Sequence, residues 1–440
     1  MKKIGYSFIF CLMMPILSKA ALNLEVTKGV KGLTPIGVTP FDWQGAQKTP
    51  PVDFEKLITQ DLQNSGKFSI VFGNNQLKNG QPELTRWQQK KVNALLTGSF
   101  QDQGNNQYQV QYTLTNVYKN PGSQEMNNSA VFGVDSGAVL AQQHFLVTKD
   151  QLRKTAHKIA NQVYQKLTGK PGVFLTKLAY VLVTSGPGGR PFYHLVVSDY
   201  DGSAPQIVLS SYEPILSPAW SPDARSLAYV AYQNNQAAVY VTNLKSGQRR
   251  SIASYAGVDA APAFSPDGQS LVVALSKDGG VNLYKVNLQS GALTALTNNL
   301  SENTSPVFSS DGKALYFTST QGGEPQIYQF DLSQGAQSRV SFSGIANMDP
   351  TAQAGVLAYL QQVNKGIYQV VVNQNGNTIP VSGKGFVYSP TLSPDASMLV
   401  YSIYTNGEQR LVLETLSLGQ QQLLPGESGA MRYPAWSPIQ

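Results

Sequence analysis

Short apolar segments separated by polar turns recur along the second half of the chain. One unit begins at Pro262 and reads, in order, PAF, SPDGQS, LVVALS, KDGG, VNLYKVNL, QSG and ALTALT. The alternation of apolar and polar residues in the longer segments predicts half-buried strands. Pro266, Asp267 and Gly268 favour a tight turn, since they supply a preset backbone angle, a side-chain acceptor and a positive φ. Each unit therefore contains four predicted strands.

These units repeat at a nearly constant period. The first proline of the motif falls at Pro218, Pro262, Pro306, Pro350, Pro390 and Pro434, with spacings of 44, 44, 44, 40 and 44 residues. Four strands in about 44 residues is the size of a β-propeller blade. Helical repeats of similar length need apolar stripes with a 3.6-residue period, which these segments rich in glycine and proline lack.

The two ends of the repeat region complement each other. KLAYVLVTS (177–185) matches the second strand of a unit but has no first strand before it, and YPAWSPIQ (433–440) is a first strand with nothing after it. We expect the C-terminal strand to pair with the first blade and close the ring, which removes the exposed strand edges. The sequence thus predicts an all-β propeller of six blades over residues 173–440.

Residues 21–170 predict a separate α/β domain. Strands are expected over residues 35–41, 93–101 and 108–118. Helices are expected over residues 51–66 and 149–169, because apolar residues there fall on one face and glycine ends each segment. The stretch GKPG (169–172) marks the link to the propeller.

The first twenty residues predict a secretory signal. Lys2 and Lys3 precede a short apolar stretch (6–17), and SKA (18–20) supplies small residues for cleavage before Ala21. The only cysteine, Cys11, lies in this segment, so the exported chain needs no disulfide in an oxidising compartment. We expect a periplasmic protein that does not insert into the membrane.

The composition argues against several classes of function. The net charge is +7 for the whole chain, and the three lysines of the signal account for nearly half of it. So mild and dispersed a charge does not favour nucleic acid or an anionic membrane as a partner.

Catalytic patterns are absent as well. There is no Gly-x-Ser-x-Gly motif, and His144, His157 and His194 are not at metal-ligand spacing. SGPGGR (185–190) fits a hairpin turn better than a phosphate loop, and DYDG (199–202) fits a turn better than a calcium loop. The repeated acids have the sequence setting of turn residues: Asp223, Asp267, Asp311 and Asp395. We therefore expect no catalytic residue, cofactor or metal site; an exported propeller hydrolase and a ligand-binding sensor are the alternatives.

Several phrases together resemble the TolB family, periplasmic components of the Tol–Pal system of Gram-negative bacteria. They are LNLEVTKGVKGLTPIGVTPF (22–41), VSDYDG (197–202), APAFSPDG (261–268) and YPAWSP (433–438). The resemblance covers nearly the whole exported chain. It implies a monomeric binding scaffold whose propeller binds the lipoprotein Pal and whose N-terminal segment binds TolA. It also implies a role in outer-membrane integrity and constriction at division, and use by colicins.

The resemblance also suggests the residues of each binding surface. The N-terminal segment that switches conformation when Pal binds would comprise Ala21, Leu22, Asn23, Leu24, Glu25, Val26 and Thr27. The Pal face would be built from residues just before the blade prolines, in loops at one end of the ring. The candidates are Val258, Asp259, Ala261, Asn303, Thr304, Asp349, Tyr388, Met431 and Arg432. The family tends to have histidine where Val258 stands.

Overall fold

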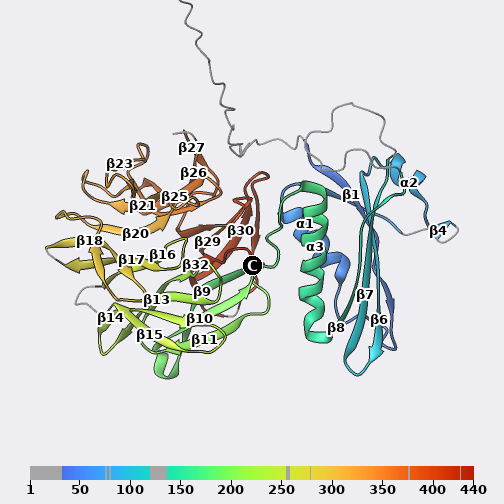
Figure 1. Ribbon diagram of the computed structural model, residues 1–440, viewed down its shortest axis with the longest axis horizontal. Helices are drawn as coiled ribbons and strands as arrows, with labels where there is room; N and C mark the ends of the chain where they lie inside the picture. Colours follow the sequence, from blue (N-terminus) through green and yellow to red (C-terminus); the bar gives the residue numbers. More distant parts are fainter. Residues whose placement is uncertain are drawn as a thin grey trace, which may run out of the picture.

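The structure is a computed structural model that describes residues 32–74, 77–78, 81–118, 136–253, 258–277, 279–374, 377–426 and 428–440. The predicted signal (1–20) and the predicted N-terminal switch (21–27) lie outside the described residues. Figure 1 shows a sheet, a pair of helices beside it and a ring of small sheets, with the helices between the sheet and the ring.

A six-stranded sheet organises the N-terminal part. Its strand order is β3-β1-β6-β7-β8, and β2 pairs with β6. Strands β1, β2 and β3 pair in parallel, whereas β6, β7 and β8 form an antiparallel meander. The bounds are β1 (Thr34–Val38), β2 (Asp42–Gln44), β3 (Phe68–Phe72), β6 (Ala94–Gly104), β7 (Gln107–Asn116) and β8 (Val139–Thr148).

Two long helices cover one face of this sheet. They are α1 (Phe54–Asn64) and α3 (Leu152–Thr168), the latter preceded by the short η1 (Lys149–Gln151). The Asp53 carboxylate caps α1 by accepting a 2.9 Å hydrogen bond from the backbone N–H of Lys56. Gly169 ends α3 with φ at 72°, as predicted for a glycine stop. No helix among the described residues combines the length and apolar character that crossing a bilayer requires.

The smaller elements of this part gather at one end of the sheet. The helix α2 (Leu84–Gln89) buries Trp87 beside Val92, Leu95 and Val117, on the face opposite α1 and α3. Next to it in the sequence is a short hairpin of β4 (Leu77–Lys78) and β5 (Gln81–Pro82).

The remaining strands form six four-stranded antiparallel sheets arranged as a ring, which confirms the predicted propeller. Blade one consists of β9 (Lys177–Ser185), β10 (Pro191–Asp199), β11 (Gln206–Ser211) and β32 (Ala430–Trp436). Blade two consists of β12 (Ile215–Trp220), β13 (Ser226–Gln233), β14 (Gln236–Asn243) and β15 (Arg249–Ala253). Blade three consists of β16 (Val258–Phe264), β17 (Ser270–Lys277), β18 (Gly280–Asn287) and β19 (Leu293–Ala295).

Blades four to six repeat this order. Blade four consists of β20 (Asn303–Phe308), β21 (Ala314–Ser319), β22 (Gln326–Asp331) and β23 (Gln337–Arg339). Blade five consists of β24 (Ala346–Gln353), β25 (Val356–Asn364), β26 (Ile367–Gln374) and β27 (Asn377–Pro380). Blade six consists of β28 (Val387–Leu392), β29 (Met398–Thr405), β30 (Glu408–Thr415) and β31 (Gln420–Leu423).

The ring closes as predicted from the sequence. Strand β32 pairs antiparallel with β9, with Met431 opposite Leu182 and Trp436 opposite Leu178. The indole N–H of Trp436 also donates a 2.8 Å hydrogen bond to Thr176 Oγ1, just before β9. The two ends of the propeller are therefore joined by both backbone and side-chain bonds.

The repeated aspartates stabilise turns, as expected. Asp267 Oδ1 accepts hydrogen bonds from Ser265 Oγ at 2.5 Å and from the backbone N–H of Gln269 at 2.9 Å. These two donors hold the pKa of Asp267 below its ordinary value. The same serine–aspartate bond recurs at Asp223, Asp311 and Asp395.

Candidate partner-binding surfaces

The inner strands give one face of the propeller its shape. Strands β12, β16, β20, β24, β28 and β32 are the first strands of their blades and contact one another around the ring. We call the end of the ring at which these six strands begin the start face. The connections from the outer strand of one blade to the inner strand of the next lie at this face.

Each inner strand contains a β-bulge at its proline. The residue before the proline has a positive φ in all six strands: Ser217 (47°), Ala261 (46°), Ser305 (50°), Asp349 (50°), Ser389 (47°) and Tyr433 (52°). A non-glycine residue rarely adopts this conformation, and a residue before proline is usually extended. The pairing register shifts at the same point in each strand. The bulge is therefore a built-in feature of every blade, and it re-aims the side chain at that position.

The predicted Pal-face residues lie within these strands. The expectation that they lie in loops is wrong, because each inner strand begins before its proline and carries the bulge inside it. Val258, Asp259 and Ala261 belong to β16, and Asn303 and Thr304 to β20. Asp349 belongs to β24, Tyr388 to β28, and Met431 and Arg432 to β32.

Two of the predicted residues are inaccessible to a partner in this structure. Asn303 is fully buried and donates from Nδ2 to the Val281 carbonyl at 3.0 Å and to Asn299 Oδ1 at 2.9 Å, while Ser319 Oγ donates to its Oδ1 at 2.8 Å. Met431 is also fully buried. Both side chains hold the start of an inner strand in place.

Other predicted residues are accessible to different degrees. Tyr388 and Arg432 are exposed, and Arg432 Nε donates to Gln409 Oε1 at 2.8 Å. Thr304, Ala261 and Asp349 are half-buried. Asp349 accepts a 2.9 Å hydrogen bond from Ser305 Oγ of the neighbouring blade, and burial raises the pKa of its carboxyl.

The start face also exposes large apolar side chains that the sequence analysis missed. They sit just before or within β20, β24 and β28 and at the adjoining end of β29, on three consecutive blades. The backbone N–H of Tyr404 donates to the Phe386 carbonyl at 3.0 Å, which places the last two elements side by side. We call this set the apolar rim: Leu300 (85% exposed), Phe342 (75%), Ile345 (47%), Phe386 (49%), Tyr388 (36%) and Tyr404 (52%).

A buried polar network joins the propeller to the N-terminal helices. Tyr200, in the turn after β10, donates from its hydroxyl to Asp61 Oδ1 of α1 at 2.6 Å. Asp61 Oδ2 lies 2.7 Å from Nδ1 of His157 on α3. All three side chains are almost completely buried. Burial lowers the pKa of His157, but the Asp61 and Asp201 carboxylates together raise it by more, so the pKa lies above its ordinary value.

Charged residues extend this network towards solvent. Arg153 of α3 bonds the Asp201 carboxylate and lies 3.5 Å from Asp199, and Lys177 Nζ donates to Asp199 Oδ1 at 2.5 Å. A ring nitrogen of His157 and carboxylate oxygens of Asp199 and Asp201 lie within 4.8 Å of one another, a spacing that could hold a metal ion. Because Arg153 and Lys177 already neutralise both carboxylates, we assign this cluster to joining the two parts of the chain.

The other two histidines have no such setting. His194 Nδ1 lies 2.7 Å from Ser210 Oγ within blade one; His194 of β10 is buried, whereas its partner Ser210 on β11 is exposed. His144 is exposed on β8. SGPGGR forms the connection between β9 and β10, including the short η2 (Pro187–Gly189), which confirms the predicted hairpin turn.

Comparison with known proteins agrees with this architecture. The family model described as the TolB β-propeller domain matches residues 164–440, and the model of the TolB amino-terminal domain matches residues 22–122. The Tol-Pal system protein TolB of Coxiella burnetii is 37% identical over 261 residues, which cover 58% of this chain and 56% of that protein. The match thus spans about half the length of that relative.

A solved structure extends the similarity over most of the chain. The crystal structure of TolB from Acinetobacter baumannii is 30% identical, covers 94% of this chain and 99% of that one, and superposes with a TM-score of 0.78. Since the propeller model alone accounts for more than half of the residues, the chain belongs to the TolB family.

Proposed function

We propose that this chain is an exported, periplasmic component of the Tol–Pal system and acts as a binding scaffold rather than as an enzyme. The family assignment and the name of the Coxiella relative, a Tol-Pal system protein, support this. The proposed division of the chain is a signal over residues 1–20, an α/β domain over 21–170 and the propeller over 173–440. The scaffold would couple envelope layers through protein contacts, and so maintain the outer membrane and its constriction during division.

The apolar rim is the observation that carries the proposed Pal site. Exposed apolar side chains that cluster on one face, with a polar surround, mark protein interaction surfaces. The closed ring holds its loops on a rigid frame, so the docking surface is preformed and binding orders few residues. Colicins would use the same face.

The residues suggested by the family resemblance take different parts in this proposal. Tyr388 and Arg432 would contact Pal directly, as would the accessible parts of Thr304, Ala261 and Asp349 together with Val258 and Asp259. Asn303 and Met431, being buried, would instead fix the strand starts that present these contacts.

The N-terminal segment is proposed to bind TolA and to change conformation when Pal binds. Coupling of this kind is reciprocal: if Pal binding shifts the segment, the state of the segment must alter the affinity for Pal. The network from Tyr200 to Asp61 supports such coupling, because it holds the propeller and the N-terminal helices in one fixed relation.

A calorimetric titration with the periplasmic domain of Pal from the same organism tests the proposal. The chain from residue 21 and a chain from residue 29 should both bind with one-to-one stoichiometry, with different affinities. Equal affinities of the two chains would contradict the conformational switch but leave the scaffold proposal standing. No binding to either chain would contradict the scaffold proposal.

A further inference from the structure

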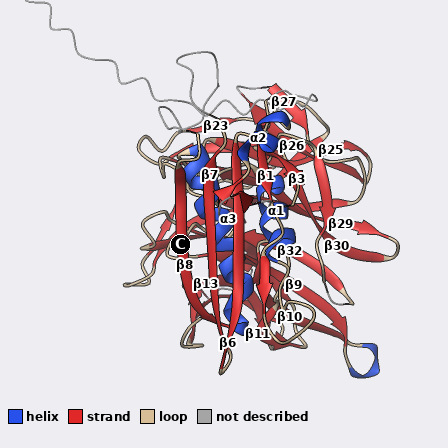
Figure 2. Ribbon diagram, turned by 90° about the vertical axis from the view of Figure 1, so that its right-hand side faces the viewer, coloured by secondary structure: helices blue, strands red, loops and turns tan. Residues whose placement is uncertain are grey.

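The N-terminal sheet has one face that nothing else among the described residues covers fully. Helices α1 and α3 pack on the face towards the propeller, so the opposite face of β6, β7 and β8 is turned away from the ring, and Figure 2 views the molecule from this side. Residues directly opposite each other on paired strands share a face. Asp42, Ser99, Gln111 and His144 form one such row across β2, β6, β7 and β8.

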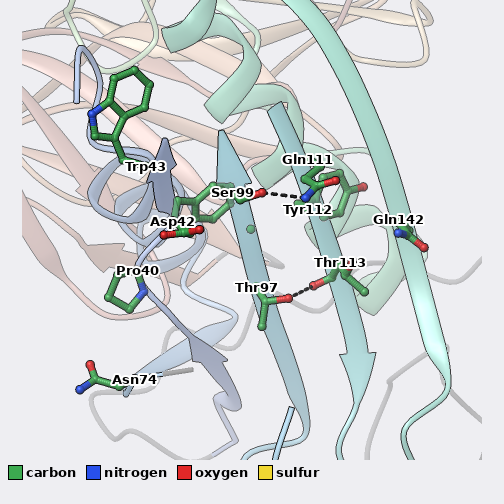
Figure 3. A pocket seen from close by; sticks show the side chains of 12 residues that line it. Pro40, Asp42, Trp43, Asn74, Thr97, Ser99, Gln111, Tyr112, Thr113 and Gln142 are labelled. Atoms are coloured by element: carbon green, nitrogen blue, oxygen red, sulfur yellow. Dashed lines mark hydrogen bonds between the residues drawn. The ribbon is translucent and has the colours of Figure 1, made fainter. Parts of the chain in front are cut away.

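A shallow groove of about 590 Å³ lies on this face. Figure 3 shows Thr97 and Ser99 of β6, Thr113 and Gln111 of β7, and Gln142 of β8 along its floor, with Asp42 at its side. Gln111 Nε2 donates to Ser99 Oγ at 2.7 Å. The volume of the groove falls within the range of ordinary ligand sites.

The groove has no positively charged side chain among the described residues that line it, which argues against anionic ligands. Asp42 is the single charged residue among those lining it, and none of them is a lysine or an arginine, although the chain as a whole carries a net charge of +7. Nucleic acids, anionic lipids and acidic peptides would find no counter-charge here. An apolar segment would have to cover side-chain amides and hydroxyls without satisfying them, which costs free energy.

Uncharged amides and hydroxyls both donate and accept hydrogen bonds, as the hydroxyl and acetamido groups of a sugar do. A carboxylate can accept from two hydroxyls at once, and Gln44 Nε2 holds Asp42 in place by donating to Oδ2 at 3.0 Å. We propose that this groove binds a neutral glycan chain. If the protein is exported, as proposed above, the glycan layer of the cell envelope would supply such a chain. Only this source of the glycan rests on the proposed function.

The strand geometry favours a linear polymer over a single sugar. Residues on one face of a strand recur about every 7 Å, because the rise is about 3.4 Å per residue. The floor therefore repeats hydrogen-bonding groups along β6, at Thr97 and Ser99, and along β7, at Thr113 and Gln111. The paired residues Gln101 and Gln109 continue these rows just beyond the groove. An extended chain of sugars can satisfy successive positions of such a ladder.

Titration with tetra-N-acetylchitotetraose tests the proposal, with tetragalacturonic acid as an anionic comparison. The purified protein should bind the neutral oligomer saturably. Gln111→Ala should weaken binding about fivefold, the effect of losing one hydrogen bond, and Thr113→Arg should abolish it by filling the groove. Gln289→Ala, an exposed glutamine in a turn of blade three, is the matched control and should bind like the unaltered protein.

Three results would overturn the proposal. They are no saturation up to about 10 mM oligomer, so that any dissociation constant lies above that concentration; preference for the anionic oligomer; or unaltered binding by both groove variants. An unchanged thermal unfolding midpoint shows that a variant remains folded. If Thr113→Arg does not fold, the binding measured for Gln111→Ala decides the test alone. The Pal titration is measured on the same proteins and should be unaffected, so failure here leaves the scaffold proposal standing.

Discussion

The Tyr200 hydroxyl and the Asp61 carboxylate, 2.6 Å apart, connect the first propeller blade to helix α1 through a fully buried hydrogen bond. Nearby, Thr415 Oγ1 of β30 donates to the Asn64 carbonyl at the end of α1 at 3.0 Å. The helix is thus bonded to the first and the last complete blade, at the point where the ring closes. This arrangement fixes how the N-terminal domain is oriented on the propeller.

Removing the hydroxyl by Tyr200→Phe should destabilise the protein. The variant leaves a buried carboxylate with one donor fewer, and hydrogen bonds to charged groups contribute about 1.5 to 3 kcal/mol. We expect the free energy of unfolding in urea to fall by about 2 kcal/mol. Tyr240→Phe is the control, because Tyr240 makes an exposed 3.3 Å bond to Gln233 within one blade; its effect should stay below about 0.5 kcal/mol. Equal effects of the two variants would contradict the importance of this contact.

The His157–Asp61 pair should make stability depend on pH. Because Asp61 raises the pKa of His157 in the folded state, the pair contributes fully below about pH 6.5, the unfolded value, and less as pH rises through the folded pKa. His157→Gln keeps a donor but removes the charge. The unfolding free energy lost in this variant should be about 1 to 3 kcal/mol at pH 6 and smaller at pH 9.

The exposed His144 provides the control for this comparison. His144→Gln should change the unfolding free energy by less than about 0.5 kcal/mol at either pH. If the loss in His157→Gln were larger at pH 9 than at pH 6, the raised pKa of His157 would be refuted.

Deprotonation of the Glu414 carboxyl should lower the free energy of unfolding at high pH. This buried carboxyl on β30 accepts from Gln421 Nε2 at 3.2 Å, and burial raises its pKa to about 7. Between pH 4.5 and 7 the folded state holds the proton more tightly than the unfolded state, so stability falls as pH rises through this window. Glu414→Gln should therefore raise the unfolding free energy by roughly 2 to 3 kcal/mol at pH 8 and change it little at pH 4.

An exposed acid on the same strand makes a suitable comparison. Glu408 pairs with Arg410 Nη1 at 3.3 Å, and Glu408→Gln should alter the unfolding free energy by less than about 0.5 kcal/mol at both pH values. A Glu414→Gln variant that is less stable than the unaltered protein at pH 8 would show that the carboxylate is stabilising there.

In the inner strands, the effect of a glycine substitution on stability should depend on the φ angle of the residue replaced. Ala261 has φ at 46°, where a Cβ is strained and glycine is not. Ala261→Gly should therefore leave stability unchanged or raise it by up to about 1 kcal/mol, whereas Ala261→Val should lower it by at least that amount. Ala219 lies in the corresponding strand of blade two, just past the bulge. Ala219→Gly should cost about 1 kcal/mol in chemical denaturation, the usual penalty of glycine in a strand.

The sequence predicts the propeller well because each blade repeats the same local pattern. The strand at residues 177–185 lacks a first-strand neighbour, and the final YPAWSP is a first strand without a blade. Pairing the two completes one blade, and β32 pairs with β9 in this way. The helices α1 and α3 are likewise predictable, since both have apolar faces and glycine stops. Strand β8 was missed because polar Gln143 lies on the face towards α3, while apolar Leu146 lies exposed on the opposite face, so the strand lacks a clear apolar alternation. Helix α2 is only six residues long, too short for a periodic signal.

The proposed binding surface was harder to predict for a physical reason. Distance from the blade proline does not reveal that a bulge lies inside the strand, so buried Asn303 and exposed Tyr388 have similar sequence settings. The apolar rim consists of single large residues within turn-like stretches, such as Leu300 and Phe342. Isolated apolar residues of this kind are as common in the core as on a surface, and only the tertiary structure separates the two cases.

The last prediction concerns the apolar rim and compares two exposed leucines that lie at different places on the propeller. Leu300 lies at the start face, and Leu423 lies on the outer strand β31; both are exposed leucines. Truncation to alanine should leave the thermal midpoint of either variant unchanged, because neither side chain is buried. If the rim is the docking surface, Leu300→Ala should weaken Pal binding by at least about tenfold, the effect of losing 1.4 kcal/mol of apolar burial. Leu423→Ala should bind as the unaltered protein does. Equal affinities of the two variants would move the Pal site away from the rim, while weaker binding by Leu423→Ala alone would place it near the outer edge of blade six.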